Sequence, residues 1–121
     1  MKTYKVIISG SRTFNDYAIV RDACDNILQD KADSHNIVIV SGTAKGTDRL
    51  GEQYAFERGY EILRFPADWQ KYGKPAGIIR NKQMALAADA LIAFWDGKSA
   101  GTASMIRFAK EKNMSIRIIH V

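Results

Sequence analysis

The sequence predicts an α/β fold of the Rossmann-like class, a five-stranded, mainly parallel sheet with helices on both faces. Five short apolar runs alternate along the chain with four segments in which apolar residues recur at helical spacing. Four of the five runs carry β-branched residues in near-continuous blocks, which is typical of strands buried on both faces of a parallel sheet. Alternating strands and helices favour right-handed crossovers between parallel neighbours, so we expect a single sheet covered by helices.

The expected strands are short and follow one another along the whole chain. They cover residues 4–9, 37–41, 61–65, 90–95 and 115–120. The blocks Val6-Ile7-Ile8 and Ile37-Val38-Ile39-Val40 give the first two runs their β-branched character. The fourth run is apolar but contains fewer β-branched residues, and it completes the alternation of strand and helix.

Each of the four intervening segments has one apolar face. The pair Asn15-Asp16 is placed to cap the first helix, and Gly59 is placed to close the second. The residues that define the four faces are, in order, Tyr17, Val20, Cys24, Ile27 and Leu28; Leu50, Tyr54 and Ala55; Ile78, Ile79, Met84, Ala85 and Ala88; and Met105, Ile106, Phe108 and Ala109.

Length and charge limit the range of functions. The chain has 121 residues, which fits one domain covering 1–121, and its net charge is +5. The excess lies in residues 64–121, where ten basic side chains face four acidic ones for a net charge of +6. A basic half of this kind favours an anionic partner, either a nucleotide or a polynucleotide.

Cysteine and histidine usage bears on the compartment and on metal binding. Cys24 is the only cysteine, which excludes a disulfide framework and favours a reducing compartment. No apolar run approaches the roughly 20 residues that span a bilayer, and residues 1–5 lead directly into the first strand. We therefore expect a cytoplasmic protein that does not insert in membranes. His35 and His120 are far apart and Cys24 lies on a core face, so no metal cluster is expected.

Glycine, serine and threonine cluster around basic residues in the loops that leave the predicted strands. The clusters cover residues 9–13, 41–48 and 96–102, whereas the loops that enter strands have the composition of ordinary turns. Open α/β sheets bind ligands at the carboxyl ends of their strands. Glycine allows the backbone to approach a ligand, and the amides at a helix amino terminus attract anions. The sequence therefore predicts an anion site at this edge.

The standard nucleotide and hydrolase motifs are missing from these loops. There is no G-x-x-x-x-G-K-[ST] segment, which disfavours a P-loop NTPase, and Ser9-Gly10-Ser11-Arg12 does not fit G-x-G-x-x-G. No histidine lies on the ligand edge, so a Ser-His-Asp triad is disfavoured as well.

Several motifs together point to a known group. They are Gly10-Ser11-Arg12, the segment SGTAKGTD at 41–48, the segment PADW at 66–69, Gly73, Ala76-Gly77, Arg80-Asn81, Met84 and Gly101-Thr102. This combination resembles the SLOG superfamily, named for Smf/DprA and LOG proteins, and within it the short, stand-alone YspA/YpsA-related branch. The resemblance implies that a nucleotide or nucleotide-derived small molecule binds at the carboxyl edge of the sheet, for sensing, sequestration or processing of a nucleotide signal.

The resemblance also implies which residues form the site. Asp48 suits a ribose hydroxyl or the capping of its helix, while Arg80 and the helix start near Ser99 suit phosphates. The ligand itself is not identified, and no metal is implied. The candidate binding residues are Gly10, Ser11, Arg12, Ser41, Gly42, Lys45, Gly46, Asp48, Arg80, Asn81, Ser99, Gly101 and Thr102.

Two alternatives to ligand binding stay open. LOG-type phosphoribohydrolases carry a P-G-G-x-G-T-x-x-E pattern whose glutamate helps to cleave an N-glycosidic bond; here Met105 stands at that position, and a thioether is neither acid nor base. Asp48, Asp68 and Asp96 are candidate replacements, so catalysis is undecided. The DprA resemblance and the basic half favour single-stranded nucleic-acid binding, although a long basic run is missing. Because members of the family associate, a homo-oligomer is expected.

Overall fold

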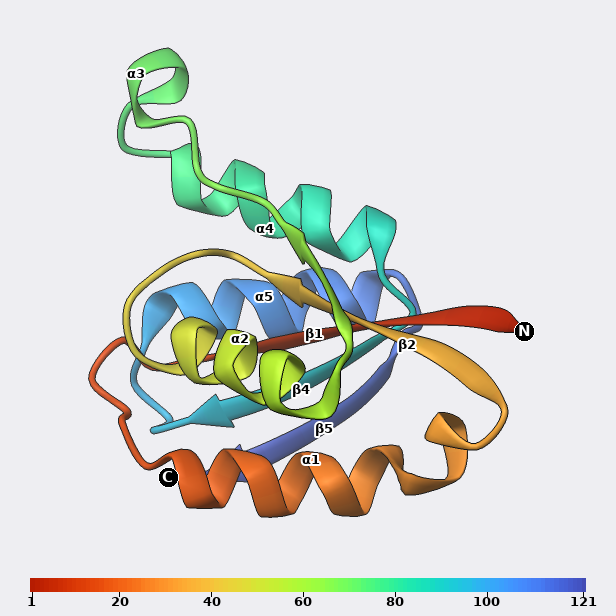
Figure 1. Cartoon of the computed structure of the whole chain (residues 1–121). Helices are drawn as coiled ribbons and strands as arrows, with labels where there is room; N and C mark the ends of the chain where they lie inside the picture. The colour runs from red at the N-terminus through yellow and green to blue at the C-terminus, as the bar shows by residue number, and fades with distance from the viewer.

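A computed structural model describes residues 1–121 and shows one sheet between two layers of helices (Figure 1). All neighbouring strands are parallel, and their order in the sheet is β3-β2-β1-β4-β5. The predicted Rossmann-like α/β fold is therefore confirmed. The elements are β1 (Lys2–Gly10), α1 (Tyr17–Ala32), β2 (His35–Ser41), α2 (Thr47–Arg58), β3 (Glu61–Arg64), α3 (Trp69–Tyr72), α4 (Ala76–Ala87), β4 (Ala90–Trp95), α5 (Ala100–Glu111) and β5 (Ser115–His120).

The strand order reverses at the centre of the sheet. The chain builds outward from β1 to β2 and β3, then crosses to the other side of β1 and builds outward through β4 to β5. The loops that follow β1 and β4 therefore leave in different directions. Such a switch point opens a crevice outside the carboxyl ends of the two strands, which is where ligands of open α/β sheets bind.

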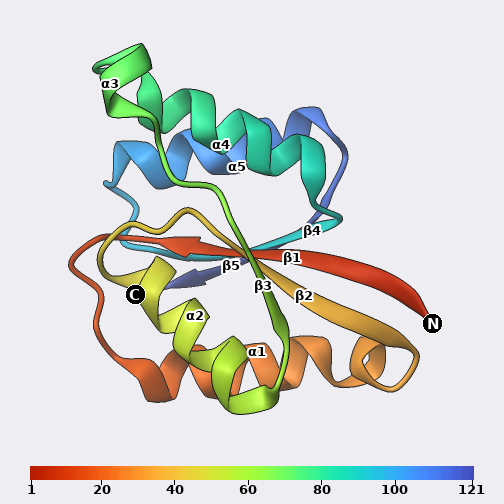
Figure 2. The same cartoon turned by 45° about the horizontal axis from the view of Figure 1, so that its top comes forward.

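The two faces of the sheet carry separate apolar cores. Figure 2 shows α1 and α2 on one side of the sheet and α4 and α5 on the other. Because side chains alternate along a strand, Val6 and Ile8 pack in the first core while Ile7 packs in the second. Cys24 is fully buried in the first core and Met105 in the second, as their helical spacing predicts.

The helix ends follow local sequence signals. Asp16 caps α1, because its side chain accepts a hydrogen bond from the Ile19 amide at 3.4 Å. Gly59 closes α2 in the left-handed conformation. The single turn α3 is not predicted by apolar periodicity; it is held instead by Asp68, which accepts from the Lys71 amide at 3.0 Å. None of the helices combines the length and the apolar character needed to cross a membrane.

Two glycines with positive φ are expected to differ sharply in their tolerance of a side chain. At Gly46, with φ of 74°, a Cβ would overlap the Arg12 carbonyl oxygen and lie 2.6 Å from that of Ser11. At Gly59, with φ of 70°, nothing lies within 4 Å of the Cβ position. Gly46→Ala is therefore expected to lower the free energy of unfolding by at least about 3 kcal/mol, and Gly59→Ala by only about 1 kcal/mol. Urea denaturation of both variants checks this; equal losses would contradict it.

Candidate functional site

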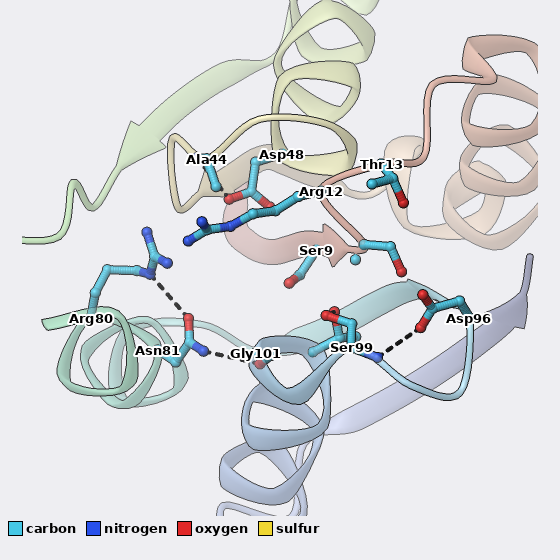
Figure 3. A pocket seen from close by; sticks show the side chains of 13 residues that line it. Ser9, Arg12, Thr13, Ala44, Asp48, Arg80, Asn81, Asp96, Ser99 and Gly101 are labelled. Atoms are coloured by element: carbon cyan, nitrogen blue, oxygen red, sulfur yellow. Dashed lines mark hydrogen bonds between the residues drawn. The ribbon is translucent and has the colours of Figure 1, made fainter. Parts of the chain in front are cut away.

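Two adjoining cavities lie at the carboxyl edge of the sheet. The β1–β4 cavity, of about 330 Å³, lies at the switch point (Figure 3) and is lined by Ser9, Gly10, Ser11, Arg12, Thr13, Ala44, Asp48, Arg80, Asn81, Asp96, Ser99, Gly101 and Thr102. The β2–β3 cavity, of about 460 Å³, follows the next two strands and is lined by Arg12, Gly42, Thr43, Ala44, Lys45, Arg49, Pro66, Ala67, Trp69 and Arg80. Arg12, Ala44 and Arg80 belong to both cavities.

The structure brings most of the candidate residues together. Eleven of them line one or both cavities: Gly10, Ser11, Arg12, Asp48, Arg80, Asn81, Ser99, Gly101 and Thr102 at the first, with Gly42 and Lys45 at the second. Ser41 and Gly46 line neither. The buried Ser41 hydroxyl donates to Glu52 Oε2 at 2.6 Å and accepts from the Thr43 amide at 3.1 Å, so it shapes the loop from behind.

Other lining residues were not among the candidate binding residues, although Asp96 was a candidate for catalysis and Trp69 belongs to the PADW motif. They include Ser9, Thr13, Ala44 and Asp96 at the β1–β4 cavity, and Thr43, Arg49, Pro66, Ala67 and Trp69 at the β2–β3 cavity. Arg49 had a usable signal, because a basic residue in the first turn of a helix opposes the helix dipole and is favoured there by an anionic ligand. Trp69 ends the PADW motif, and the single turn α3 places its side chain at the β2–β3 cavity.

Arg80 is a buried cation without a carboxylate partner. Only 7% of the residue is exposed, and the ion pairs of the chain involve other residues. Its Nε donates to Asn81 Oδ1 at 3.0 Å and its Nη1 donates to the Gly42 carbonyl oxygen. Burial lowers the pKa of the Arg80 guanidinium, while the charge of Asp48 acts in the opposite direction. A desolvated positive charge that faces two cavities is a site for an anion.

Two neighbours hold Arg80 in this position. Asn81 Nδ2 donates to the Gly101 carbonyl at 3.2 Å and to Ser104 Oγ at 3.0 Å, which ties the start of α4 to the start of α5. A Cβ on Gly42 would lie 2.7 Å from Asp48 Oδ2 and 2.9 Å from Arg80 Nη1. The loop after β2 therefore passes between the carboxylate and the guanidinium only because residue 42 is glycine.

Asp48 is the buried carboxylate of the site. Its Oδ2 accepts a hydrogen bond from the Ala44 amide at 3.1 Å, which closes the loop between β2 and α2. Burial raises the pKa of Asp48 to about 6, although the Ala44 amide and Arg80 favour the ionised form. The group thus titrates close to neutral pH, at the point where a ligand would contact it.

The amino terminus of α5 adds neutral donors to the β1–β4 cavity. Ser99 is the N-cap, and its side chain makes no capping hydrogen bond, so the first amides of α5 remain available to a ligand. Asp96 shapes this turn, because its Oδ1 accepts from the amides of Lys98 and Ser99, each at 2.8 Å. These bonds hold the pKa of Asp96 below its ordinary value. The buried hydroxyl of Ser11 makes no well-formed hydrogen bond, but it lies close enough to Asp96 to contribute to this lowering.

The fold and this edge define a Rossmann-like α/β protein with a polar cavity at the switch point of its sheet and a basic cavity beside it. A sequence model of the YspA, cpYpsA-related SLOG family matches residues 4–72, which is more than half of the chain. The chain belongs to this family, as the sequence motifs predict. Arg80 and the start of α5 lie beyond the matched segment, and the structure places them opposite the matched loops.

Three known proteins are similar to this chain. The Gene 61 protein of Mycobacterium phage D29 is 33% identical over 118 residues, which cover 93% of both chains. DprA from Streptococcus pneumoniae has a TM-score of 0.72 and 17% identity, over 97% of this chain and 50% of its own. DprA from Helicobacter pylori, which has a single-stranded DNA binding mode, has a TM-score of 0.67 and 22% identity, over 95% and 64%. The chain thus spans about half to two-thirds of the DprA chains, and the likeness shows the fold.

The residues considered as replacements for a catalytic glutamate fall in different places. Met105, at the position of the LOG-type glutamate, is fully buried in the core beneath α5 and faces no cavity. Asp68 caps α3 and lines neither cavity. Asp48 and Asp96 line the β1–β4 cavity, but both already accept backbone hydrogen bonds that shape their loops.

Proposed function

We propose that this chain binds a nucleotide or a nucleotide-derived small molecule at the carboxyl edge of its sheet. The observation that carries the proposal is Arg80, a cation that is 7% exposed, faces both cavities and has no carboxylate in ion-pair contact. A phosphate that contacts Arg80 and the amino terminus of α5 would supply the missing negative charge and accept hydrogen bonds from the free amides of α5.

The groups around the phosphate site favour a nucleotide over inorganic phosphate. The β1–β4 cavity offers the hydroxyls of Ser11 and Thr102 and the carboxylate of Asp48, which suit the hydroxyls of a ribose. The β2–β3 cavity offers the indole of Trp69, which suits a base. Both volumes fall in the range of about 300–1,000 Å³ that is usual for small-molecule sites.

Thermal denaturation with a panel of nucleotides tests the proposal. At a ligand concentration of about 100 times Kd, binding stabilises the protein by about 2.7 kcal/mol, which is roughly 10 °C for a domain of this size. We expect a shift of this size with at least one nucleotide and its loss in Arg80→Ala and in Lys45→Ala. Lys82→Ala, which removes an exposed charge on α4 outside both cavities, is the matched control and should keep the shift. A panel without any shift would contradict the proposal.

Single-stranded nucleic acid is the second candidate. The β2–β3 cavity carries four basic side chains and no carboxylate, and H. pylori DprA binds single-stranded DNA. A strand that makes about 6–10 phosphate contacts loses about 10³–10⁵ in affinity between roughly 50 and 200 mM salt, whereas a small nucleotide loses far less. A steep salt dependence with an oligonucleotide, without a shift by any mononucleotide, would favour this second function.

A further inference from the structure

We propose that the ligand occupies both cavities at once, and that it is a dinucleotide with a terminal phosphate besides its phosphodiester. This inference rests on the proposed function and adds the class of ligand. The two phosphates would lie on opposite sides of the Arg12–Arg80 pair, and the base of one nucleotide would stack on Trp69.

The Arg12–Arg80 pair joins the cavities. Both side chains line both cavities, and Figure 3 shows them reaching from opposite sides toward the same space. Arg12 has neither an ion pair nor a hydrogen bond of its own, and its charge lowers the pKa of Arg80 further. Two like charges that face one gap repel each other, and phosphates on either side of the pair offset the repulsion.

One phosphate does not account for the charge of the site. In the β1–β4 cavity, the carboxylate of Asp48 lies near the two arginines, and Asp96 adds a second carboxylate at the opposite side of the cavity (Figure 3). The β2–β3 cavity adds Lys45 and Arg49, and no carboxylate lines it. Neither of these two side chains lines the β1–β4 cavity, so a phosphate bound there leaves them without a counter-charge. A second phosphate in the β2–β3 cavity supplies it.

The aromatic contact lies on the β2–β3 side alone. Trp69 is 53% exposed, and no aromatic side chain lines the β1–β4 cavity. The Cβ position of Gly77 is 3.6 Å from Trp69 Cη2 and 3.9 Å from Arg80 Nη2, so the indole and the guanidinium both lie near the start of α4. A base that stacks on Trp69 therefore places its sugar and phosphate next to Arg80, within reach of the Arg12–Arg80 pair.

The β1–β4 cavity also offers a side chain, Ser11, that can bind the remaining part of the ligand. Ser11 is 3% exposed, and its hydroxyl lines this cavity close to the Asp96 carboxylate, whose ionised form it favours, without a well-formed hydrogen bond. A ligand oxygen in the cavity can accept a well-formed hydrogen bond from this buried hydroxyl. Because Ser11 and Arg49 line different cavities, each reports on one end of the ligand.

Calorimetric titration with AMP and with the dinucleotide pApA, at constant salt, tests this inference. We expect pApA to bind at least about 10-fold more tightly than AMP, since a further charge-assisted phosphate contact is worth about 1.5–3 kcal/mol. Ser11→Ala and Arg49→Ala should both weaken pApA binding, by several-fold and by at least about 10-fold respectively. AMP, which fills one cavity, should respond to only one of the two. Lys82→Ala should change neither titration.

The outcomes separate the two levels of the proposal. If AMP binds and pApA binds no more tightly, or if one of the two substitutions leaves the affinity for pApA unchanged, the dinucleotide inference is wrong and the proposed function stands. If neither compound nor any other nucleotide binds, both fail. A 5′-phosphorylated 20-mer that binds like pApA and needs its 5′-phosphate supports the two-phosphate chemistry at a strand end. A 20-mer that binds far more tightly than pApA, with or without that phosphate, overturns it.

Discussion

Replacing Arg80 by methionine is expected to weaken the binding of a phosphate-bearing nucleotide by at least about 100-fold, because the guanidinium supplies charge-assisted hydrogen bonds worth about 1.5–3 kcal/mol each. The ligand-free protein should melt within about 5 °C of the wild type, since removing a desolvated charge offsets the loss of its hydrogen bonds to Gly42 and Asn81. Calorimetric titration and thermal denaturation of the same samples measure both effects.

Two further variants make this test specific. Arg80→Lys keeps the charge but not the fork of donors, so its loss of affinity should be smaller than that of Arg80→Met. Lys82→Met removes an exposed charge from the same helix and should leave the affinity unchanged. Unaltered affinity in Arg80→Met would remove Arg80 from the site.

Replacing Asp48 by asparagine is expected to raise the free energy of unfolding at pH 7 by about 3 kcal/mol. Burial raises the pKa of Asp48 to about 6 from an ordinary value of 3.8, and each unit of difference corresponds to about 1.36 kcal/mol. The amide oxygen of asparagine can still accept the hydrogen bond of the Ala44 amide, so the change removes mainly the buried charge. The expected rise in melting temperature is roughly 10 °C.

The raised pKa of Asp48 determines the direction in which the stability of the protein changes with pH. Because the folded state holds the Asp48 proton more tightly than the unfolded state, the wild type loses stability as the pH rises from about 4 to about 6. Above about pH 6 the stability cost of the buried Asp48 charge is constant. Below about pH 4 Asp48 is protonated in both the folded and the unfolded state, so the cost is absent. The gain of Asp48→Asn should therefore vanish near pH 4, and denaturant unfolding at both pH values measures it. The control Asp30→Asn, at an exposed position on α1, should show no such gain. If Asp48→Asn also shows no gain at pH 7, the carboxylate is solvated and the prediction is wrong.

Both substitutions address the same property of the site. Arg80 and Asp48 are buried ionisable groups that make no ion pair with each other, which costs stability in the ligand-free protein. Sites of this kind exchange stability for function, because the ligand completes the interactions that the fold leaves open. Stabilisation by Asp48→Asn together with loss of affinity in Arg80→Met would show this exchange directly.

The sequence carries the fold class through patterns that are local. Continuous β-branched blocks mark the central strands, and the cap at Asp16 and the glycine at 59 mark the ends of α1 and α2. Where an element depends on a distant neighbour, the local pattern is insufficient. The strand β1 begins at Lys2 rather than at residue 4 because Lys2 and Thr3 pair with His35 and Asn36 of β2.

The sequence predicts which loops form the candidate site, but it does not predict which way each side chain of these loops points. Glycine-rich loops with basic residues identify the carboxyl edge, and the strand order brings the loops after β1 and β4 together. Which way a loop residue faces depends on the whole loop: Ser41 turns inward to Glu52, while Arg49 and Trp69 face the β2–β3 cavity. The place of Arg49 in the first turn of α2 gives a short-range signal, but no such pattern shows which way Ser41 or Trp69 faces.

Mapping a bound nucleotide by amide chemical shifts is the most direct test of the central claim, that a phosphate-bearing small molecule binds between the loops after β1, β2 and β4. We expect ADP added to the ¹⁵N-labelled protein to shift the amides of Ser11, Gly42, Gly101 and Thr102, together with the side-chain signals of Arg80. Shifts confined to the opposite edge of the sheet, or spectra that stay unchanged with every nucleotide of the panel, would contradict the account.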